Sequence, residues 1–194
     1  MNLIERAKNI ILKPKEEWIV VEQETTSVQE IVTTYLIPLA LIPAVASFIR
    51  WGLLGYSSFI GASMSWGIKY AIISLVTTIG GVYLSAFIID ALATNFGSVK
   101  DFRKAMQLVV YSYTPMLVAG IFQIIPGLSF LGIVGLYGLY LLYIGIAPMM
   151  KTPEDKVTGY FIVSLVVLIV IYAILVTILT AAFLGGSITG ALIK

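Results

Sequence analysis

The chain has 194 residues, of which 59% are hydrophobic and 11% are charged, with a net charge of +2 at pH 7. Soluble domains are typically about 45–50% apolar and about 25% charged, so this composition argues against a soluble protein, and the small net charge gives no reason to expect a nucleic-acid partner. The chain has no cysteine and no histidine, which removes disulfides, thiolate metal sites and the commonest general base.

Two long stretches contain no charged residue. One has 46 residues, between Lys104 and Lys151, and the other has 37, between Lys156 and Lys194. A membrane-spanning helix needs about 20 consecutive apolar residues, whereas the strands of a membrane barrel alternate between apolar and polar residues. We therefore predict an all-α, polytopic membrane protein: a bundle of five transmembrane helices with an N-terminal amphipathic cytoplasmic helix.

The first 30 residues are predicted to form a cytoplasmic, amphipathic and polar segment, followed by the five-helix domain over residues 31–194. Apolar residues recur at helical spacing over residues 1–12, which indicates a short helix lying on the membrane surface. The alternative is a helix packed on the bundle, with Arg6 on its polar face in either case. Pro14 ends this helix. In the polar stretch 15–30 that follows, Trp18 is expected to be an interfacial anchor.

Five spans follow in chain order, at about residues 31–49, 70–90, 105–125, 128–150 and 157–184. Pro38 and Pro43 should bend the first span, and Pro115 should kink the third, because proline removes a backbone donor. Residues 51–68 are uncharged but rich in Gly and Ser. We expect them to form an outer loop in the headgroup region, with a sixth span as the alternative.

The distribution of positive charge predicts the orientation. With a cytoplasmic N-terminus, nine of the twelve Lys and Arg residues lie on the inner side and three on the outer side. Cytoplasmic loops carry the excess of positive charge. The sequence therefore predicts a multi-pass protein of the cell membrane whose N-terminus is cytoplasmic.

Polar side chains within the spans are the first candidate site. Asp90 is an acid at the edge of a span, where it either pairs with Lys100, Arg103 or Lys104 or has an ion or proton role. Three glycines in the fourth span, Gly132, Gly135 and Gly138, suggest close helix contact. The predicted polar seam comprises Asp90, Tyr111, Tyr113, Pro115, Tyr137, Tyr140 and Tyr143. It forms either hydrogen bonds between helices or a polar pathway or headgroup pocket.

Basic residues of the inner loops are the second candidate site, for contact with lipid or a partner. They are Lys100, Arg103, Lys104, Lys151 and Lys156. Anionic lipid attracts such residues with about 1 kcal/mol each, although the orientation rule alone also accounts for them. The sequence has no phosphate loop and no metal-ligand spacing, so we expect no enzyme, no catalytic residue, no cofactor and no metal site.

Several segments resemble those of the Yip-type (Ypt/Rab-interacting protein) family of membrane proteins. The stretch from Asn95 to Ala105, followed by Tyr111 to Pro115, is similar to the family signature of a Gly-containing turn, a Phe with basic residues, and a Tyr and Pro in the next span. Residues 13–18 and 151–156 are similar to segments of the bacterial branch. The resemblance covers most of the chain, and the five-span layout agrees with it.

The resemblance implies a non-enzymatic role. Eukaryotic relatives are linked to Rab GTPases and vesicle traffic and associate with themselves and with each other. This sequence lacks their Asp-Leu-Tyr-Gly-Pro element, so the resemblance does not extend to a Rab partner. We predict a membrane scaffold or adaptor that acts through helix association and through lipid or protein contacts at the cytoplasmic face. The expected partners are membrane lipids, a second copy of the chain, or another membrane protein. The alternative is a small transporter, channel or lipid-moving protein that uses the Tyr/Asp seam.

Overall fold

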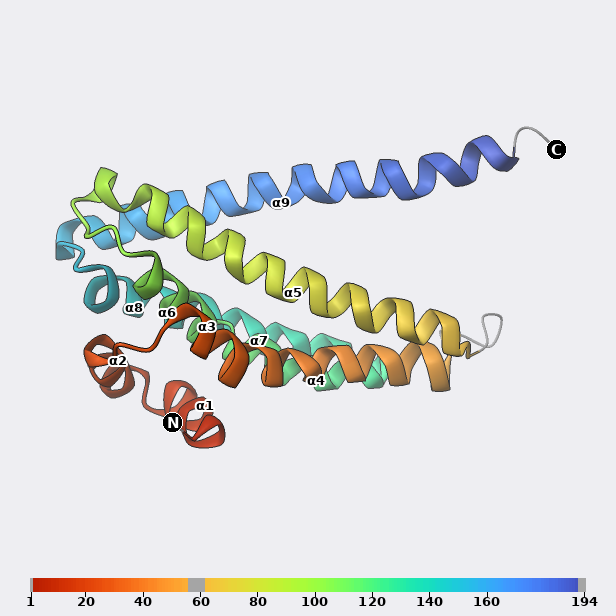
Figure 1. Ribbon diagram of the computed structural model, residues 1–194, viewed down its shortest axis with the longest axis horizontal. Coiled ribbons are helices and arrows are strands. Elements are labelled where there is room, and N and C mark those ends of the chain that lie inside the picture. Colours follow the sequence, from red (N-terminus) through yellow and green to blue (C-terminus); the bar gives the residue numbers. More distant parts are fainter. Residues whose placement is uncertain (1, 56–61, 192–194) are drawn as a thin grey trace.

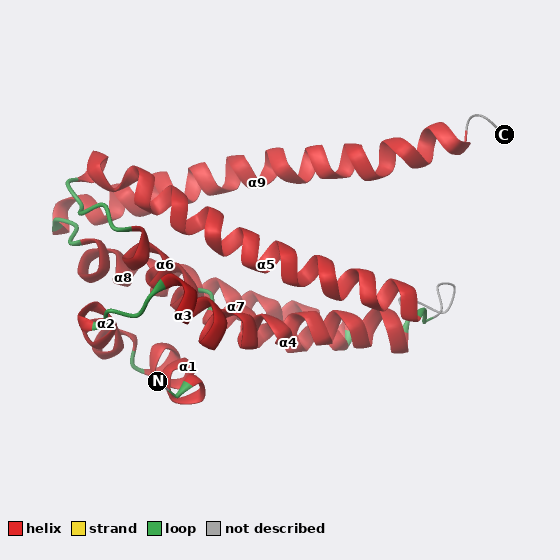
Figure 2. Cartoon of the chain, in the orientation of Figure 1, coloured by secondary structure: helices red, strands yellow, loops and turns green. Residues whose placement is uncertain are grey.

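Helices joined by short loops make up the described part of the chain (Figures 1 and 2). The computed structural model describes residues 2–55 and 62–191, without the side chains at positions 126, 172 and 175–191. Helices are the expected result for such apolar segments, because lipid offers the backbone no hydrogen-bond partners and a helix satisfies its own.

The α-helices of the described residues differ widely in length, from four residues in α3 to 38 in α9. They are α1 (Leu3–Leu12), α2 (Pro14–Gln23), α3 (Val28–Ile31), α4 (Ile37–Phe48), α5 (Met64–Leu92), α6 (Phe102–Ser112), α7 (Thr114–Ala119), α8 (Tyr137–Met150) and α9 (Glu154–Ala191). Wider π-helical turns cover Val32–Leu36 and Ile49–Leu54. Tighter 3₁₀ segments cover Ala93–Phe96, Gly120–Ile124 and Pro126–Leu136.

Four stretches are long and apolar enough to cross a membrane, namely Val28–Leu54, Met64–Phe96, Phe102–Ile124 and Gly127–Met150. They correspond to the first four predicted spans, with ends that differ by up to six residues. The fifth predicted span, residues 157–184, falls on α9. The side chains of its second part lie outside the described residues, so a count of five spans stays a prediction.

The first span is longer than predicted at both ends. It begins where Ser27 caps α3, its hydroxyl accepting the Glu30 N–H at 3.1 Å. It ends before Gly55, whose φ of +77° is a conformation that favours glycine. Pro38 has no N–H to bond the carbonyl one turn earlier, and the backbone there widens into the π-helical turn Val32–Leu36.

Part of the predicted outer loop is helical instead. Helix α5 begins at Met64 rather than at residue 70, and the first span continues to Leu54. The start of α5 packs closely on the end of the first span at two glycines, because a Cβ on Gly67 would lie 2.6 Å from the Gly52 Cα. The rings of Trp51 and Tyr70 stack beside them at 4.2 Å. Residues 56–61 of the predicted loop lie outside the described residues.

The third span is interrupted near the proline that was expected to kink it. Helix α6 ends at Ser112 and α7 begins at Thr114, with Pro115 in its first turn. Asp101 caps the start of α6, since its carboxylate accepts the Lys104 N–H at 3.1 Å.

The spacing of the glycines in the fourth span matches its 3₁₀ conformation over Pro126–Leu136. A 3₁₀ helix has three residues per turn, so Gly132 and Gly135 align along one side. A Cβ on Gly135 would lie 3.2 Å from the Met116 Cα, and one on Gly138 would lie 2.4 Å from the Ser112 carbonyl oxygen. The predicted close helix contact is confirmed at these two glycines, whereas Gly132 faces open space.

The core is concentrated at the end of the bundle where α1 and α2 pack (Figure 1). Its largest fully buried side chains include Trp18, Tyr35, Tyr111 and Tyr160. Away from this end, α9 diverges from α5 (Figure 1). Of the two expectations for the first helix, packing on the bundle describes α1, because Arg6 and Ile10 are buried.

Candidate functional site

An ion-pair network centred on Arg6 joins the two N-terminal helices. Arg6 comes from the middle of α1 and is only 5% exposed. Its two terminal nitrogens donate hydrogen bonds to the carboxylates of Glu17, in the first turn of α2, and Glu24, directly after its last residue. A buried arginine needs this pairing, since an isolated charge inside a protein is very costly. The network therefore fixes the angle between α1 and α2.

The same arginine lies over an aromatic cluster that belongs to the bundle. The guanidinium carbon is 5.4 Å from the centroid of the Tyr111 ring on α6, within the range of a cation–π interaction. Trp18 and Tyr35 meet that ring edge to face, at centroid distances of 6.3 and 4.9 Å. The Tyr35 hydroxyl in turn bonds the Thr114 hydroxyl at 2.9 Å. Arg6 thus connects the N-terminal helices to the third span.

Trp18 occupies a notch on α8 that only glycine permits. A Cβ on Gly145 would lie 2.7 Å from one ring carbon of Trp18 and 2.6 Å from a methyl group of Leu108. The indole is 1% exposed, and its N–H has no hydrogen-bond partner among the described residues. Shape rather than hydrogen bonding therefore holds this side chain, and Trp18 lies inside the protein rather than at a lipid interface.

Two lysines of the bundle hold the end of α2. The Lys104 ammonium donates to the backbone carbonyls of Val21 at 3.3 Å and Glu24 at 2.9 Å, and also to that of Glu22. A cation at a helix C-terminus satisfies its last carbonyls and opposes the helix dipole. Lys151 donates to the Glu22 carboxylate, and this hydrogen bond and positive charge lower the pKa of Glu22. We call the contacts of Arg6, Trp18, Lys104 and Lys151 the docking site.

The predicted basic contact residues therefore separate into two groups. Lys104 and Lys151 bind α2, although the Lys151 side chain is itself 57% exposed. Arg103 lies 3.5 Å from Asp101 at the start of α6. Lys100 and Lys156 are exposed. The structure thus brings Lys104 and Lys151 together at the docking site and leaves Lys100 and Lys156 at the surface.

The residues of the predicted polar seam are placed on several helix interfaces. The Tyr113 hydroxyl bonds Ser85 on α5 at 3.1 Å, whereas the Tyr137 hydroxyl donates to the Ile11 carbonyl at 3.1 Å. Pro115 is buried in the first turn of α7. Two further tyrosines lie along α8: the Tyr140 ring is 5.4 Å from that of Tyr137, and the Tyr143 hydroxyl bonds Thr158 at 3.1 Å.

Asp90 is buried near the end of α5, where it is 8% exposed. Its Oδ1 atom has no hydrogen-bond partner among the described residues. The neighbouring Ile89 carbonyl accepts a hydrogen bond from Tyr160 on α9. Within the described residues Asp90 forms no ion pair with Lys100, Arg103 or Lys104: Lys104 turns to the carbonyls of α2, and Arg103 lies beside Asp101.

Sequence reasoning missed the residues at the centre of the docking site. Arg6 was assigned to the polar face of the first helix, yet it is buried there. Leu3, Arg6 and Ile10 are three and four residues apart, so they share one stripe of α1. A cation within an apolar stripe is the signal that identifies Arg6. The role of Glu17 and Glu24 has no comparable signal, because the same segment also contains Glu16, Glu22 and Glu30.

Comparison with known proteins identifies the family. Residues 8–191 match the family model of the Yip1 domain. No curated protein and no solved structure matches the chain. The match includes α2, the four apolar stretches and all of α9, and it begins two residues after Arg6. This chain is a multi-pass membrane protein that belongs to the Yip1 domain family.

Proposed function

We propose that this protein is a non-enzymatic scaffold or adaptor of the cell membrane, with five spans and a cytoplasmic N-terminus. Its N-terminal helices present a contact surface for lipid or for a protein partner. The observation that carries the proposal is the docking site, in which a buried arginine and two lysines fix α1 and α2 on one end of the bundle. A surface held in this way is pre-organised, which lowers the entropic cost of binding.

The proposed contact surface is the exposed side of α1 and α2. On α1, Ile4, Lys8 and Leu12 are each four residues apart and therefore share one face. Ile4 and Leu12 are 75% and 65% exposed. On α2, Lys15 and Ile19 have the same spacing, and Ile19 is 59% exposed. We call these five residues the outer surface of the helix pair. Large apolar side chains next to lysines suit an anionic membrane surface or an acidic, partly apolar protein.

The orientation is tested by tags at the two ends of the chain. An odd number of spans places the termini on opposite sides of the membrane, and the excess of lysine and arginine places the N-terminus inside. We expect a reporter that is active only in the cytoplasm to function at the N-terminus and to fail at the C-terminus. The same activity at both ends would contradict the five-span arrangement.

The contact surface is tested by photocrosslinking in native membranes. A small aliphatic diazirine amino acid is placed at Ile4 or Ile19, and at Ile10 as the matched control, because Ile10 is fully buried on the same helix as Ile4. We expect crosslinks to lipid, to another protein or to a second copy from Ile4 and Ile19, and only crosslinks within the chain from Ile10. If all three positions gave only crosslinks within the chain, the proposed surface would be wrong.

Transport is not favoured by the described residues. A polar pathway would need aligned polar groups across the bundle, whereas the hydroxyls of Tyr113, Tyr137 and Tyr143 bond partners on different helix interfaces. The docking site also lies at one end of the bundle rather than at its centre (Figure 1). A scaffold accounts both for the separate tyrosine hydrogen bonds and for the position of the docking site. We therefore expect vesicles that contain the purified protein to show no added flux of ions.

A further inference from the structure

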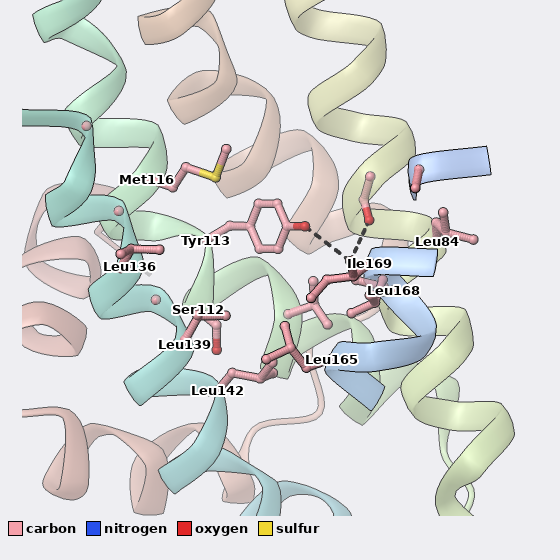
Figure 3. A pocket seen from close by; sticks show the side chains of 17 residues that line it. Leu84, Ser112, Tyr113, Met116, Leu136, Leu139, Leu142, Leu165, Leu168 and Ile169 are labelled. Atoms are coloured by element: carbon pink, nitrogen blue, oxygen red, sulfur yellow. Dashed lines mark hydrogen bonds between the residues drawn. The ribbon is translucent and has the colours of Figure 1, made fainter. Parts of the chain in front are cut away.

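A large cavity lies between helices in the middle of the bundle, away from the docking site. Its volume is about 810 Å³ and it is partly open at one side. Figure 3 shows Leu139 and Leu142 on one wall and Leu165, Leu168 and Ile169 of α9 on the opposite wall. Helices α5, α6 and α7 and the 3₁₀ segment Pro126–Leu136 complete the lining.

The cavity lies at the depth of the hydrocarbon core. Ser112 lines it and comes ten residues after Phe102, where α6 begins. At about 1.5 Å per residue this is about 15 Å along the helix, which is half of the roughly 30 Å core of a bilayer. The occupant must therefore be found among molecules that reach the middle of the membrane.

Apolar side chains and glycines make up nearly all of the wall. The described lining has no charged residue, and its polar groups are three hydroxyls. Ser85 and Tyr113 bond each other at 3.1 Å, with Tyr113 reaching towards α5 in Figure 3. Ser112 is 3% exposed, and its hydroxyl has no partner within the described part of the chain. Such a wall cannot replace the water around an ion or a charged headgroup.

The size of the cavity selects one occupant. A helix about 10 Å across rises 5.4 Å per turn and so takes roughly 400 Å³ per turn. The cavity thus holds about two turns and is too small for a spanning helix of a second copy. It is well within the range of ligand pockets, about 300–1,000 Å³.

An empty apolar void of this size would lose contact energy in proportion to its volume. We propose that this cavity binds one hydrocarbon chain of a membrane lipid, inserted from the side.

Glycines supply the matched variants for the test. A Cβ on Gly81 meets only the Tyr113 hydroxyl, at 4.0 Å, and one on Gly132 meets nothing within 4 Å, and both glycines line the cavity. Gly81→Leu and Gly132→Leu therefore fill the cavity from two different walls. Gly80 is the control, because it is also in open space but does not line the cavity. Gly80→Leu adds the same side chain one residue away.

The test uses the full-length protein in nanodiscs of phosphatidylcholine that contain a small fraction of phosphatidylcholine with a diazirine in one acyl chain. Labelled peptides are identified by mass spectrometry after illumination. We expect label on peptides that contain Leu84, Leu139 or Leu168 in the original protein and in Gly80→Leu. Each added leucine displaces about four methylene groups of a bound chain, so this labelling should fall roughly tenfold or more in Gly81→Leu and in Gly132→Leu.

Other outcomes would overturn the proposal. Equal labelling in Gly80→Leu and the two cavity-filling variants would place the lipid elsewhere. Crosslinks between two copies of the chain at the same peptides, without lipid label, would show that the cavity is a contact between copies and not a lipid site. Ser112→Ala should label like the original protein, because a hydrocarbon chain offers no acceptor, and a loss of label in this variant would indicate a polar ligand instead. Labelling at Val76, which is 64% exposed and does not line the cavity, should be unchanged in every folded variant.

Discussion

Replacing Arg6 should release the N-terminal helices from the bundle while leaving the bundle folded. In the variant Arg6→Met, Glu17 keeps its charge with a side chain only 10% exposed, and Glu24 keeps its charge at 25% exposure. Removing one partner of a buried ion pair costs about 3–5 kcal/mol, because the remaining charge has no compensation. Methionine retains much of the apolar volume of arginine, so the expected loss is mainly electrostatic.

This loss of stability predicts the change in the hydrogen-exchange rates of the α2 amides. Since 1.4 kcal/mol corresponds to tenfold, amides of α2 should exchange about 100- to 4,000-fold faster in Arg6→Met. Amides in the middle of α5 serve as the internal reference and should keep their rates. The matched control is Lys13→Met, because the Lys13–Glu16 pair is 3.9 Å long and its side chains are 67% and 76% exposed. Such a pair is worth about 0–1 kcal/mol.

A second substitution separates charge from packing. The double variant of Arg6→Met and Glu17→Met removes both charges of the more deeply buried ion pair. No unpaired charge then remains at position 17, so most of the protection of the α2 amides from exchange should return. The explanation would be refuted if Arg6→Met exchanged no faster than Lys13→Met. It would also fail if the double variant exchanged as fast as Arg6→Met alone, because the defect would then not be an unpaired charge.

Three other predictions concern packing and pH. Gly138→Ala should lower the melting temperature strongly, because its Cβ would lie 2.4 Å from a backbone carbonyl of α6, whereas Gly132→Ala should be tolerated in open space. Trp18→Ala should cost about 3–5 kcal/mol of stability in chemical unfolding, as for other large buried side chains, and a cost below 1 kcal/mol would contradict its place in the docking site. The Glu22–Lys151 pair lowers the pKa of Glu22, so it stabilises the fold fully above the ordinary glutamate pKa of about 4.3 and loses this effect as pH falls through the lowered value. The melting temperatures of Glu22→Gln and the original protein should therefore differ at pH 7 and converge once the pH lies below the lowered pKa of Glu22.

The apolar stretches were predictable because a membrane span depends on a property of the local sequence. Runs without charge located four of them, and Pro115 located the break between α6 and α7. Their exact ends depend on tertiary contacts. Helix α5 starts early because Gly67 packs against Gly52, fifteen residues away along the chain. No periodicity within a single segment contains that information.

The docking site was harder to predict, because its partners are far apart in the sequence. Lys104 was predicted to be a basic contact residue of an inner loop. Its acceptors are backbone carbonyls about 80 residues earlier in the chain. A carbonyl has no sequence signature. Trp18 was given an interfacial role because tryptophan favours that region. It is buried because Gly145 leaves room for its ring. A glycine in a helix does not indicate in the sequence which distant side chain will pack against it.

The separation of these partners along the chain also affects biogenesis. Lys151 is synthesised 129 residues after Glu22, to which it binds. At a translation rate of about 5–20 residues per second, this delay lasts about 6–26 s. Isolated helices of ten residues are unstable in water, so α1 and α2 remain unfolded during that interval. The whole of this short segment is therefore accessible to targeting factors and chaperones while the nascent chain is being inserted, whereas only its outer surface stays accessible once Lys151 has paired with Glu22.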